Sequence, residues 1–313
     1  MKVVFLGTPQ AAVESLTALV EAGHELLGVV TRPDRPVGRS ARPLPPPVKR
    51  AAEELGLEVR QPRGVKRRAF AESLEALRPD ILVVVAYGRI LPPAVLGVAP
   101  HGAVNLHFSL LPAYRGAAPV QWALAGCEER TGVTTMRLNE KMDEGDLLLQ
   151  RAVAVEEREH APALQTRLAG VGSALLLETL AGLESGTLES HAQDHSAATY
   201  APMLSAADGE IEFSLPARAV EGRVRGLDPW PGVWVRRGEK RLRLIEAVAL
   251  PGKVAEEAGR VLELTPEGLV VACGGGSRLG LLRVQPEGRR VLEVRDAVNG
   301  RQIAPGDLLT AVR

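Results

Sequence analysis

The run Lys2-Val3-Val4-Phe5-Leu6-Gly7 has the length and apolarity of a buried strand, and it ends at a glycine. From Pro9 to Ala22, apolar residues recur at helical spacing, which predicts an amphipathic helix. Leu26–Val30 then has the pattern of a second strand, and Ile81–Ala86 is continuously apolar, as in a strand covered on both faces. This alternation predicts an α/β fold, a Rossmann-like open sheet with a parallel centre and helices on both faces.

The same alternation continues to about residue 190. Ala103–Leu106 and Val133–Leu138 are strand-like, and Ala163–Ala181 has the pattern of a leucine-rich helix. In open α/β sheets, ligands bind beyond the carboxyl ends of the strands. The residues just after the strands are therefore candidates for a functional site, and they follow Leu6, Ala86, Leu106 and Leu138.

Residues 191–207 are mostly small and polar, and this lapse in the pattern predicts a linker. Beyond it, short apolar runs alternate with glycine, proline or charged turns; the runs are Gly232–Arg236, Leu242–Leu250, Gly259–Leu264, Leu269–Ala272 and Leu279–Gln285. Regularly spaced short strands predict a small, OB-like β-barrel. We therefore expect a catalytic domain at residues 1–190 and a C-terminal β-barrel domain at 208–313.

The composition excludes several classes of protein. Lys plus Arg and Asp plus Glu both number 38, so any surface for a polyanion must be local. Cys127 and Cys273 form no CxxC pair and the six histidines show no HExxH spacing, so we expect neither a disulfide framework nor a metal. No apolar stretch reaches the roughly 18 residues of a membrane span, and the expected location is cytoplasmic.

The strongest group of polar side chains lies in Asn105–Pro119, which reads Asn-Leu-His-Phe-Ser-Leu-Leu-Pro-Ala-Tyr-Arg-Gly-Ala-Ala-Pro. If the strand continues to residue 107, Asn105 and His107 project from the same face, because side chains alternate along a strand. An amide donor beside an imidazole suits the stabilisation of an oxyanion together with proton transfer. The alternative is that His107 has only a structural role.

Asp143 lies in the polar turn Met142–Asp146, which follows the strand-like run Val133–Leu138. A turn after a neighbouring strand can bring a carboxylate to the same edge of the sheet, where Asp143 would orient His107. The alternative is that Asp143 makes only local backbone hydrogen bonds within the turn. The residues by themselves leave both interpretations open.

Together these segments resemble the formyltransferases that use 10-formyltetrahydrofolate. The shared pattern is Asn-x-His-x-Ser-Leu-Leu-Pro, followed by Arg-Gly-x-x-Pro and then Asp-x-Gly-Asp. The resemblance implies that Asn105, His107 and Asp143 are the catalytic residues and that 10-formyltetrahydrofolate is the co-substrate. It also implies two folate-binding segments, Ser109–Pro112 and Val84–Pro92, in which the candidate contacts are Ser109, Leu110, Leu111, Pro112, Arg89 and Leu91.

Within this family, the chain resembles the members that act on methionyl-tRNA, and the likeness covers nearly its whole length. Asp228–Gly232 matches their C-terminal domain, and Arg32–Lys49 is similar to the loop with which they contact tRNA. The resemblance implies tRNA contacts by Arg39, Arg42 and Lys49. The chain departs from its relatives at 39–42, where they often carry consecutive lysines, and before Asp208-Gly209, where they usually carry a lysine.

The charge of the loop favours the same interpretation. Residues 32–50 contain six basic residues against Asp34 alone, and six prolines stiffen the segment. A stiff cationic arm suits a polyanionic substrate, although a merely solvated loop is the alternative. In the C-terminal part, a second basic cluster is either a tRNA-binding face or the outward face of a strand pair; it contains Arg236, Arg237, Lys240, Arg241 and Arg243.

The expected activity is therefore a one-carbon group transfer in translation initiation. The formyl group would pass from 10-formyltetrahydrofolate to the α-amino group of methionine on initiator Met-tRNA. We expect direct transfer through a tetrahedral intermediate, whose oxyanion Asn105 and His107 stabilise while Asp143 holds His107. The alternatives are a formyltransferase for a nucleotide-sugar amine, a formyl-folate hydrolase and an inert RNA-binding module. We expect a monomer.

Overall fold

The computed structural model describes residues 1–36 and 43–312, and the chain divides into two compact units. The first unit comprises Met1–Pro119, Arg130–Ala154 and Gln165–Pro202. The second comprises Val120–Glu129, Val155–Leu164 and the chain from Met203 onward. The division after Pro202 falls inside residues 191–207, so the first part of the segment predicted to be a linker belongs to the first unit.

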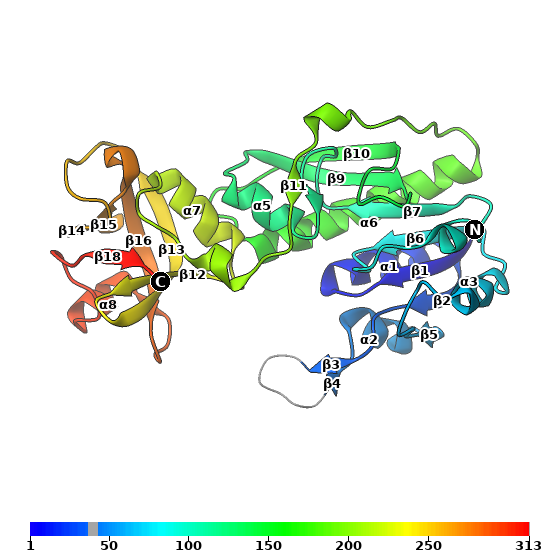
Figure 1. Ribbon diagram of the computed structural model, residues 1–313, viewed down its shortest axis with the longest axis horizontal. Helices are drawn as coiled ribbons and strands as arrows, with labels where there is room; N and C mark the ends of the chain where they lie inside the picture. The colour runs from blue at the N-terminus through cyan, green and yellow to red at the C-terminus, as the bar shows by residue number, and fades with distance from the viewer. Residues whose placement is uncertain (37–42, 313) are drawn as a thin grey trace. The chain divides into compact units, whose positions relative to one another are not determined.

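A seven-stranded sheet forms the centre of the first unit, with the strand order β10-β9-β7-β6-β1-β2-β5 (Figure 1). The strands are β1 (Lys2–Gly7), β2 (Glu25–Val30), β5 (Val59–Arg60), β6 (Ile81–Val85), β7 (Ala103–His107), β9 (Arg130–Arg137) and β10 (Leu147–Ala154). From β7 to β5 every pairing is parallel, whereas β9 runs antiparallel to both of its neighbours. β6 and β7 are buried along their whole length, which explains their nearly continuous apolar sequences.

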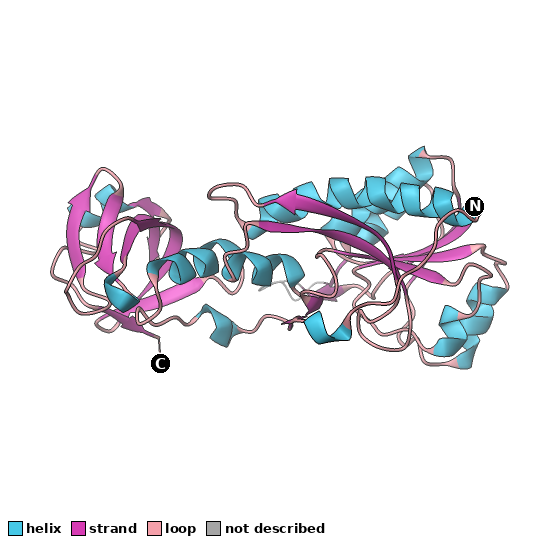
Figure 2. Cartoon of the chain, turned by 90° about the horizontal axis from the view of Figure 1, so that it is seen from above, coloured by secondary structure: helices cyan, strands magenta, loops and turns pink. Residues whose placement is uncertain are grey.

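Helices lie on both sides of this sheet (Figure 2). They are η1 (Gln10–Ala12), α1 (Val13–Glu21), α2 (Pro47–Glu54), α3 (Arg68–Glu75), α4 (Pro93–Leu96) and α6 (Ala161–Glu184), whereas α5 (Pro119–Ala125) belongs to the second unit from Val120 onward. On one face, Leu74 of α3 and Val95 of α4 share an apolar core with Val84 of β6. On the other face α6 approaches β7 closely, because Gly172 presents no side chain to Leu106.

A curled antiparallel sheet forms the second unit, with the order β14-β15-β16-β13-β12-β18 and β17 paired to β16. The strands are β12 (Val233–Arg237), β13 (Lys240–Leu250), β14 (Val261–Thr265), β15 (Gly268–Ala272), β16 (Arg278–Pro286), β17 (Leu292–Glu293) and β18 (Leu309–Ala311). A bridge between Arg260 and Leu308 brings the two edges of the sheet together in a barrel-like curl. The helices of this unit, α7 (Ala217–Gly226) and α8 (Val294–Asn299), contribute Val220, Val224 and Ala297 to its apolar core.

Four short strands complete the fold. β3 (Arg35–Pro36) pairs antiparallel with β4 (Pro43–Leu44), and β8 (Arg115–Gly116) pairs parallel with β11 (Tyr200–Ala201). The remaining single turns of 3-10 helix are η2 (His195–Ala197), η3 (Ala206–Gly209) and η4 (Gly274–Gly276). The β8–β11 pair fixes the end of the 191–202 segment beside the residues that follow β7.

The predicted fold class, an open α/β sheet followed by a small barrel, is confirmed. β10 and α7 were not predicted, for different physical reasons. β10 is a half-exposed edge strand without regular alternation, and α7 contains two glycines that weaken its helical pattern. Among the described residues, no helix is both long and apolar enough to cross a membrane.

The packing of α7 gives a test of the second unit. A Cβ at Gly222 would lie 2.5 Å from the Cys127 sulfur and 2.7 Å from the Leu124 carbonyl oxygen. Gly222→Ala should therefore lower the free energy of unfolding by about 1–3 kcal/mol, although alanine favours helix. Urea unfolding measures the change. Gly170→Ala is the control, because nothing lies within 4 Å of that Cβ on α6; it should stabilise by about 0.5–1 kcal/mol. An equal stabilisation at Gly222 would contradict the packing argument.

Candidate active site

β7 places Asn105 and His107 on one face of the sheet, as their spacing predicts, and Leu106 between them faces Gly172 of α6. Both polar side chains are buried, with Asn105 8% and His107 6% exposed. In the described part of the chain, the Asn105 carboxamide has no hydrogen-bond partner. Its donor and acceptor atoms therefore remain free for a bound molecule.

The imidazole of His107 lies between two oxygen atoms. Nε2 is 3.0 Å from the carbonyl oxygen of Tyr114, and because a carbonyl only accepts, Nε2 carries the proton of this hydrogen bond. Nδ1 is 3.7 Å from the Asp143 Oδ2 atom. The ring is thus held in one orientation, with a carboxylate beside its second nitrogen.

The loop after β9 brings Asp143 to His107 by a route that differs from the predicted one. The sequence predicts that a turn after this strand brings Asp143 to the edge of the sheet where His107 lies. Because β9 is antiparallel to β7, Arg137 at the end of β9 lies opposite Val104, three residues before His107. The loop must therefore fold back by about 10 Å, at 3.3–3.4 Å per residue, to bring Asp143 to the imidazole. The carboxylate thus lies beside His107 at the predicted edge, but the return of the loop was not predicted.

Residues with left-handed backbone occur at this pair and at the end of β6. Tyr114 and Asp143 have φ angles of 59° and 55°, and Ala86 at the end of β6 has a φ of 46°. A non-glycine residue adopts this left-handed region at a cost of roughly 1–3 kcal/mol, and such residues cluster at functional sites. The backbone N–H of Gly116 donates to Asp143 Oδ2 at 2.8 Å, so the loop after β7 and the loop after β9 are joined at the carboxylate.

The Ser109–Pro112 segment is shaped by hydrogen bonds to β9. The buried Ser109 hydroxyl donates to the Ala113 carbonyl at 2.6 Å, so it is used within the loop. The Thr134 hydroxyl donates to the Ser109 carbonyl at 2.6 Å and accepts from the Leu111 N–H at 3.2 Å. The structure therefore holds this segment beside His107 through its backbone, and its side chains Leu110 and Pro112 are half-buried.

The second predicted folate segment follows β6. Ala86 and Gly88 both have positive φ, and the Tyr87 carbonyl between them accepts from the Thr8 hydroxyl at 3.1 Å. Burial raises the pKa of Tyr87, whose hydroxyl has no partner among the described residues. Arg89 donates to the Pro62 carbonyl at 3.2 Å, and the Leu91 side chain is packed in the apolar core. Only the backbone of Leu91 is therefore available to contact a ligand.

Of the three predicted tRNA contacts, only Lys49 lies within the described residues. Arg39 and Arg42 lie outside the described residues. Lys49 on α2 forms an ion pair of 3.0 Å with Asp34, whose pKa is lowered by hydrogen bonds from Gln61 and from Lys49. The charge of Lys49 is therefore already engaged at the base of the β3–β4 pair.

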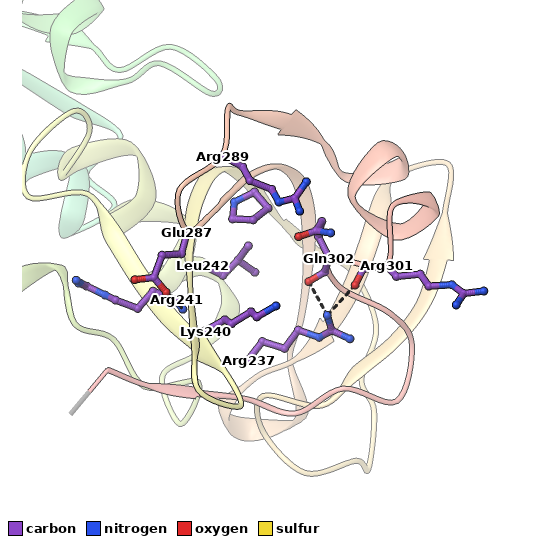
Figure 3. A pocket seen from close by; sticks show the side chains of 9 residues that line it. Arg237, Lys240, Arg241, Leu242, Glu287, Arg289, Arg301 and Gln302 are labelled. Carbon is purple, nitrogen blue, oxygen red and sulfur yellow. Dashed lines mark hydrogen bonds between the residues drawn. The ribbon is translucent and has the colours of Figure 1, made fainter.

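A basic pocket of about 280 Å³ lies in the second unit (Figure 3). It is lined by Arg237, Lys240, Arg241, Leu242, Pro286, Glu287, Arg289, Arg301 and Gln302. Arg237 is engaged within the wall, since it donates to the backbone carbonyls of Arg301 and Gln302 and pairs with Asp307. Lys240 and Arg289 are exposed at the pocket. These two exposed cations make the pocket suited to an anion.

Three members of the predicted basic cluster lie on the outward face of β12 and β13: Arg236, Arg243 and Arg241, which also borders the pocket. Arg236 is opposite Arg241, and Trp234 is opposite Arg243. The Arg241 guanidinium stacks 4.7 Å from the Trp234 ring, and Arg243 pairs with Asp228 at 3.1 Å. The strand-pair alternative is thus realised for part of the cluster, whereas tRNA binding by this cluster stays a prediction.

Several site residues were missed by the sequence analysis. Thr134 and Gln150 hold the Ser109–Pro112 segment, with Gln150 donating to the Leu111 carbonyl at 2.8 Å. Gln193 lies within the predicted linker, yet it is buried and donates to the loop that carries Asp143. These three polar residues are not part of any periodic sequence pattern that would have marked them as site residues. No group of His, Cys, Asp or Glu side chains within residues 1–36 and 43–312 is arranged to hold a metal ion.

Comparisons with known proteins fit this geometry. The family described as formyl transferase matches residues 1–180, and its C-terminal domain matches residues 203–302. The chain is 46% identical to the methionyl-tRNA formyltransferase of Solibacter usitatus, covering 99% of this chain and 98% of the relative. It is 43% identical to that of Moorella thermoacetica, covering 100% of both. An N-formyltransferase from Helicobacter canadensis, solved with folinic acid and dTDP-3-aminofucose, shares the fold: the TM-score is 0.68 at 16% identity, over 91% of this chain and 99% of that one.

The Thr134 hydroxyl allows a test of how the loop after β7 is held. Thr134→Val keeps the shape of the side chain but leaves the Ser109 carbonyl and the Leu111 N–H without this partner. We expect the free energy of unfolding to fall by about 1–3 kcal/mol, measured by urea denaturation. Thr131→Val on the same strand is the control, because the buried Thr131 makes no side-chain hydrogen bond in the described part of the chain. Equal effects of the two substitutions would show that the hydroxyl does not hold the loop.

Proposed function

The chain belongs to the methionyl-tRNA formyltransferases of the formyl transferase family, and from that premise we propose how it formylates initiator Met-tRNA. The donor is 10-formyltetrahydrofolate, and the acceptor is the α-amino group of methionine. The product, formyl-Met-tRNA, serves translation initiation. The observation that carries the mechanism is the grouping of Asn105, His107 and Asp143 at the end of β7.

Asn105 and His107 stabilise the transition state in this proposal. The neutral amine attacks the formyl carbon, a C–N bond forms, and negative charge develops on the formyl oxygen. The Asn105 carboxamide, which lacks another partner in the described residues, donates a hydrogen bond to that oxygen. His107 adds a second electrostatic contact from the same face of β7. Because the active site is buried, each contact is stronger than it would be in water.

Asp143 holds His107 and takes part in the proton balance. As the bond from the formyl carbon to N10 breaks, N10 gains a proton and the former amine loses one. The Asp143 carboxylate lies 3.7 Å from His107 Nδ1 and accepts from the Gly116 N–H, so its position beside the imidazole is fixed. A fixed carboxylate beside an imidazole supports transfer of that proton, directly or through water.

Folate is proposed to bind between the Ser109–Pro112 segment and the loop after β6. Ala86 and Gly88 turn the backbone in the left-handed region, and the Tyr87 hydroxyl is a buried polar atom without a partner in the described chain. Backbone groups in such a loop can match the ring nitrogens of a pterin. This supports ligand contact through the backbone of Arg89 and Leu91, since both of their side chains are engaged elsewhere.

Transfer RNA is proposed to contact both units. The candidate contacts are Arg39 and Arg42, which the sequence assigns to the loop of residues 32–49, and in the basic pocket of the second unit they are Lys240 and Arg289. Phosphate contacts of this kind supply affinity that decreases with salt. We also propose that the protein acts as a monomer in the cytoplasm, where its tRNA substrate enters translation.

The catalytic proposal predicts the effect of three substitutions. Asn105→Ala, His107→Ala and Asp143→Ala should each lower kcat for Met-tRNA by roughly 100–1000-fold, because each removes a group that acts on the transition state. Steady-state formylation with both substrates saturating measures the loss. Asn139→Ala, in the same loop as Asp143 but bonded only to Lys141 N–H, is the matched control. Wild-type turnover by His107→Ala would remove it from the mechanism, and transfer to a sugar-nucleotide amine or to water in place of Met-tRNA would overturn the substrate assignment.

The basic pocket predicts a salt effect. Lys240→Ala combined with Arg289→Ala should make the log–log dependence of tRNA affinity on salt shallower by about one to two units, at roughly 0.7–0.9 per lost phosphate contact. Filter binding over a range of salt concentrations measures the slope. Lys253→Ala, an exposed lysine of the same unit that does not line the pocket, should leave the slope unchanged. An unchanged slope for the double variant would show that the pocket does not contact tRNA phosphates.

A further inference from the structure

The position of Asp143 depends on contacts with residues outside its own loop. The loop returns from the end of β9 toward His107 because β9 and β7 are antiparallel. Within this loop the backbone is strained at Asp143, whose φ is 55°. A strained, returning loop keeps its position only when surrounding groups determine it.

Gln193 supplies two hydrogen bonds to this loop. Its Nε2 donates to the Asp143 carbonyl at 2.9 Å and to the Gly145 carbonyl at 2.7 Å. Gly145 is itself confined, since any Cβ there would overlap the Arg137 carbonyl. The two carbonyls on either side of Glu144 are therefore fixed by one buried amide, 5% exposed.

The same amide is bound on its other side by Arg115. The Gln193 Oε1 atom accepts from Arg115 Nη2 at 2.6 Å and from Nε at 3.2 Å. Both donors and both acceptor positions of the side chain are thus occupied, and its orientation is settled because its oxygen faces donors and its nitrogen faces carbonyls. Arg115 is 1% exposed and also contacts His195 and Glu144.

Arg115 is placed between the two residues that contact the catalytic pair. The carbonyl of Tyr114 accepts from His107, and the N–H of Gly116 donates to Asp143. The Arg115–Gln193 contact therefore joins the strand that holds both side chains to the loop that carries the carboxylate. The same loop also contacts β8 directly, through the Glu144 carboxylate beside Arg115 and the Asp143 carboxylate that accepts from Gly116.

We propose that Gln193 is a positioning residue for the formyl transfer, which acts through Asp143 and is itself held by Arg115; this rests on the proposed function. It touches neither substrate nor His107. Its role is to set the distance between the carboxylate and the imidazole, and a displacement of about 1 Å in such a pair can lower a rate by 100-fold.

The test uses the full-length protein and two replacements. Gln193→Met removes every hydrogen bond, whereas Gln193→Glu keeps an oxygen for Arg115 but sets a second oxygen against two carbonyls. Both should lower kcat by about 10–100-fold and leave the KM values for tRNA and formyl-folate within about twofold, because a misplaced carboxylate affects the transition state alone. Asp194→Ala is the matched control: it removes the cap of η2 next to Gln193 without touching the Asp143 loop, and should keep full kcat.

A double-mutant cycle separates positioning from general support of the fold. In an Asp143→Ala background, Gln193→Met should lower kcat by less than twofold, because there is no carboxylate left to position. An equal loss in both backgrounds, a rise in KM at constant kcat, or recovery of full kcat by Gln193→Glu would each overturn the proposal. Failure of the wild-type protein to formylate Met-tRNA would instead overturn the proposed function, so the two failures are distinct.

Discussion

The guanidinium of Arg115 is almost completely removed from water, and a buried charge is tolerated only when it is paired or hydrogen-bonded. Its partners come from segments far apart in the sequence: Gln193, His195 and Glu144. Satisfying this one cation therefore fixes the course of the loop after β9 and of the segment after α6. The relation between His107 and Asp143 depends on both, because the residues on either side of Arg115 hold these two side chains.

The sequence indicated the elements that carry the chemistry but not every route between them. Strand periodicity predicted that Asn105 and His107 share a face, and β7 extends to His107 as required. Periodicity carries no information on strand direction, so the antiparallel course of β9 and the return of the Asp143 loop could not be predicted. The contacts of Gln193 with the Asp143 loop could not be predicted for a related reason. Its bonds are to backbone atoms of a distant loop, and a polar residue among small residues has the composition of a linker.

The sequence predicts which segments are basic, but not which of their cations are paired in the fold. The chain has no net charge, yet its basic residues gather in the pocket of the second unit and near the β3–β4 pair. Counting charges in a segment treated Lys49 as a free cation, whereas the fold pairs it with Asp34. Local charge thus predicts which segment is basic, and only the packed structure shows which of its cations remain available to a polyanion.

The two units are not continuous stretches of the chain, since the second takes in residues 120–129 and 155–164 from within the first. Its glycine Gly222 lies against Cys127 and Leu124, so part of its packing is encoded about 100 residues upstream of α7. A recombination event that exchanged only the sequence after Pro202 would combine a new α7 with the old partners. Inheritance of this unit as an independent module would therefore require three coordinated exchanges, and its three segments are expected to diversify together.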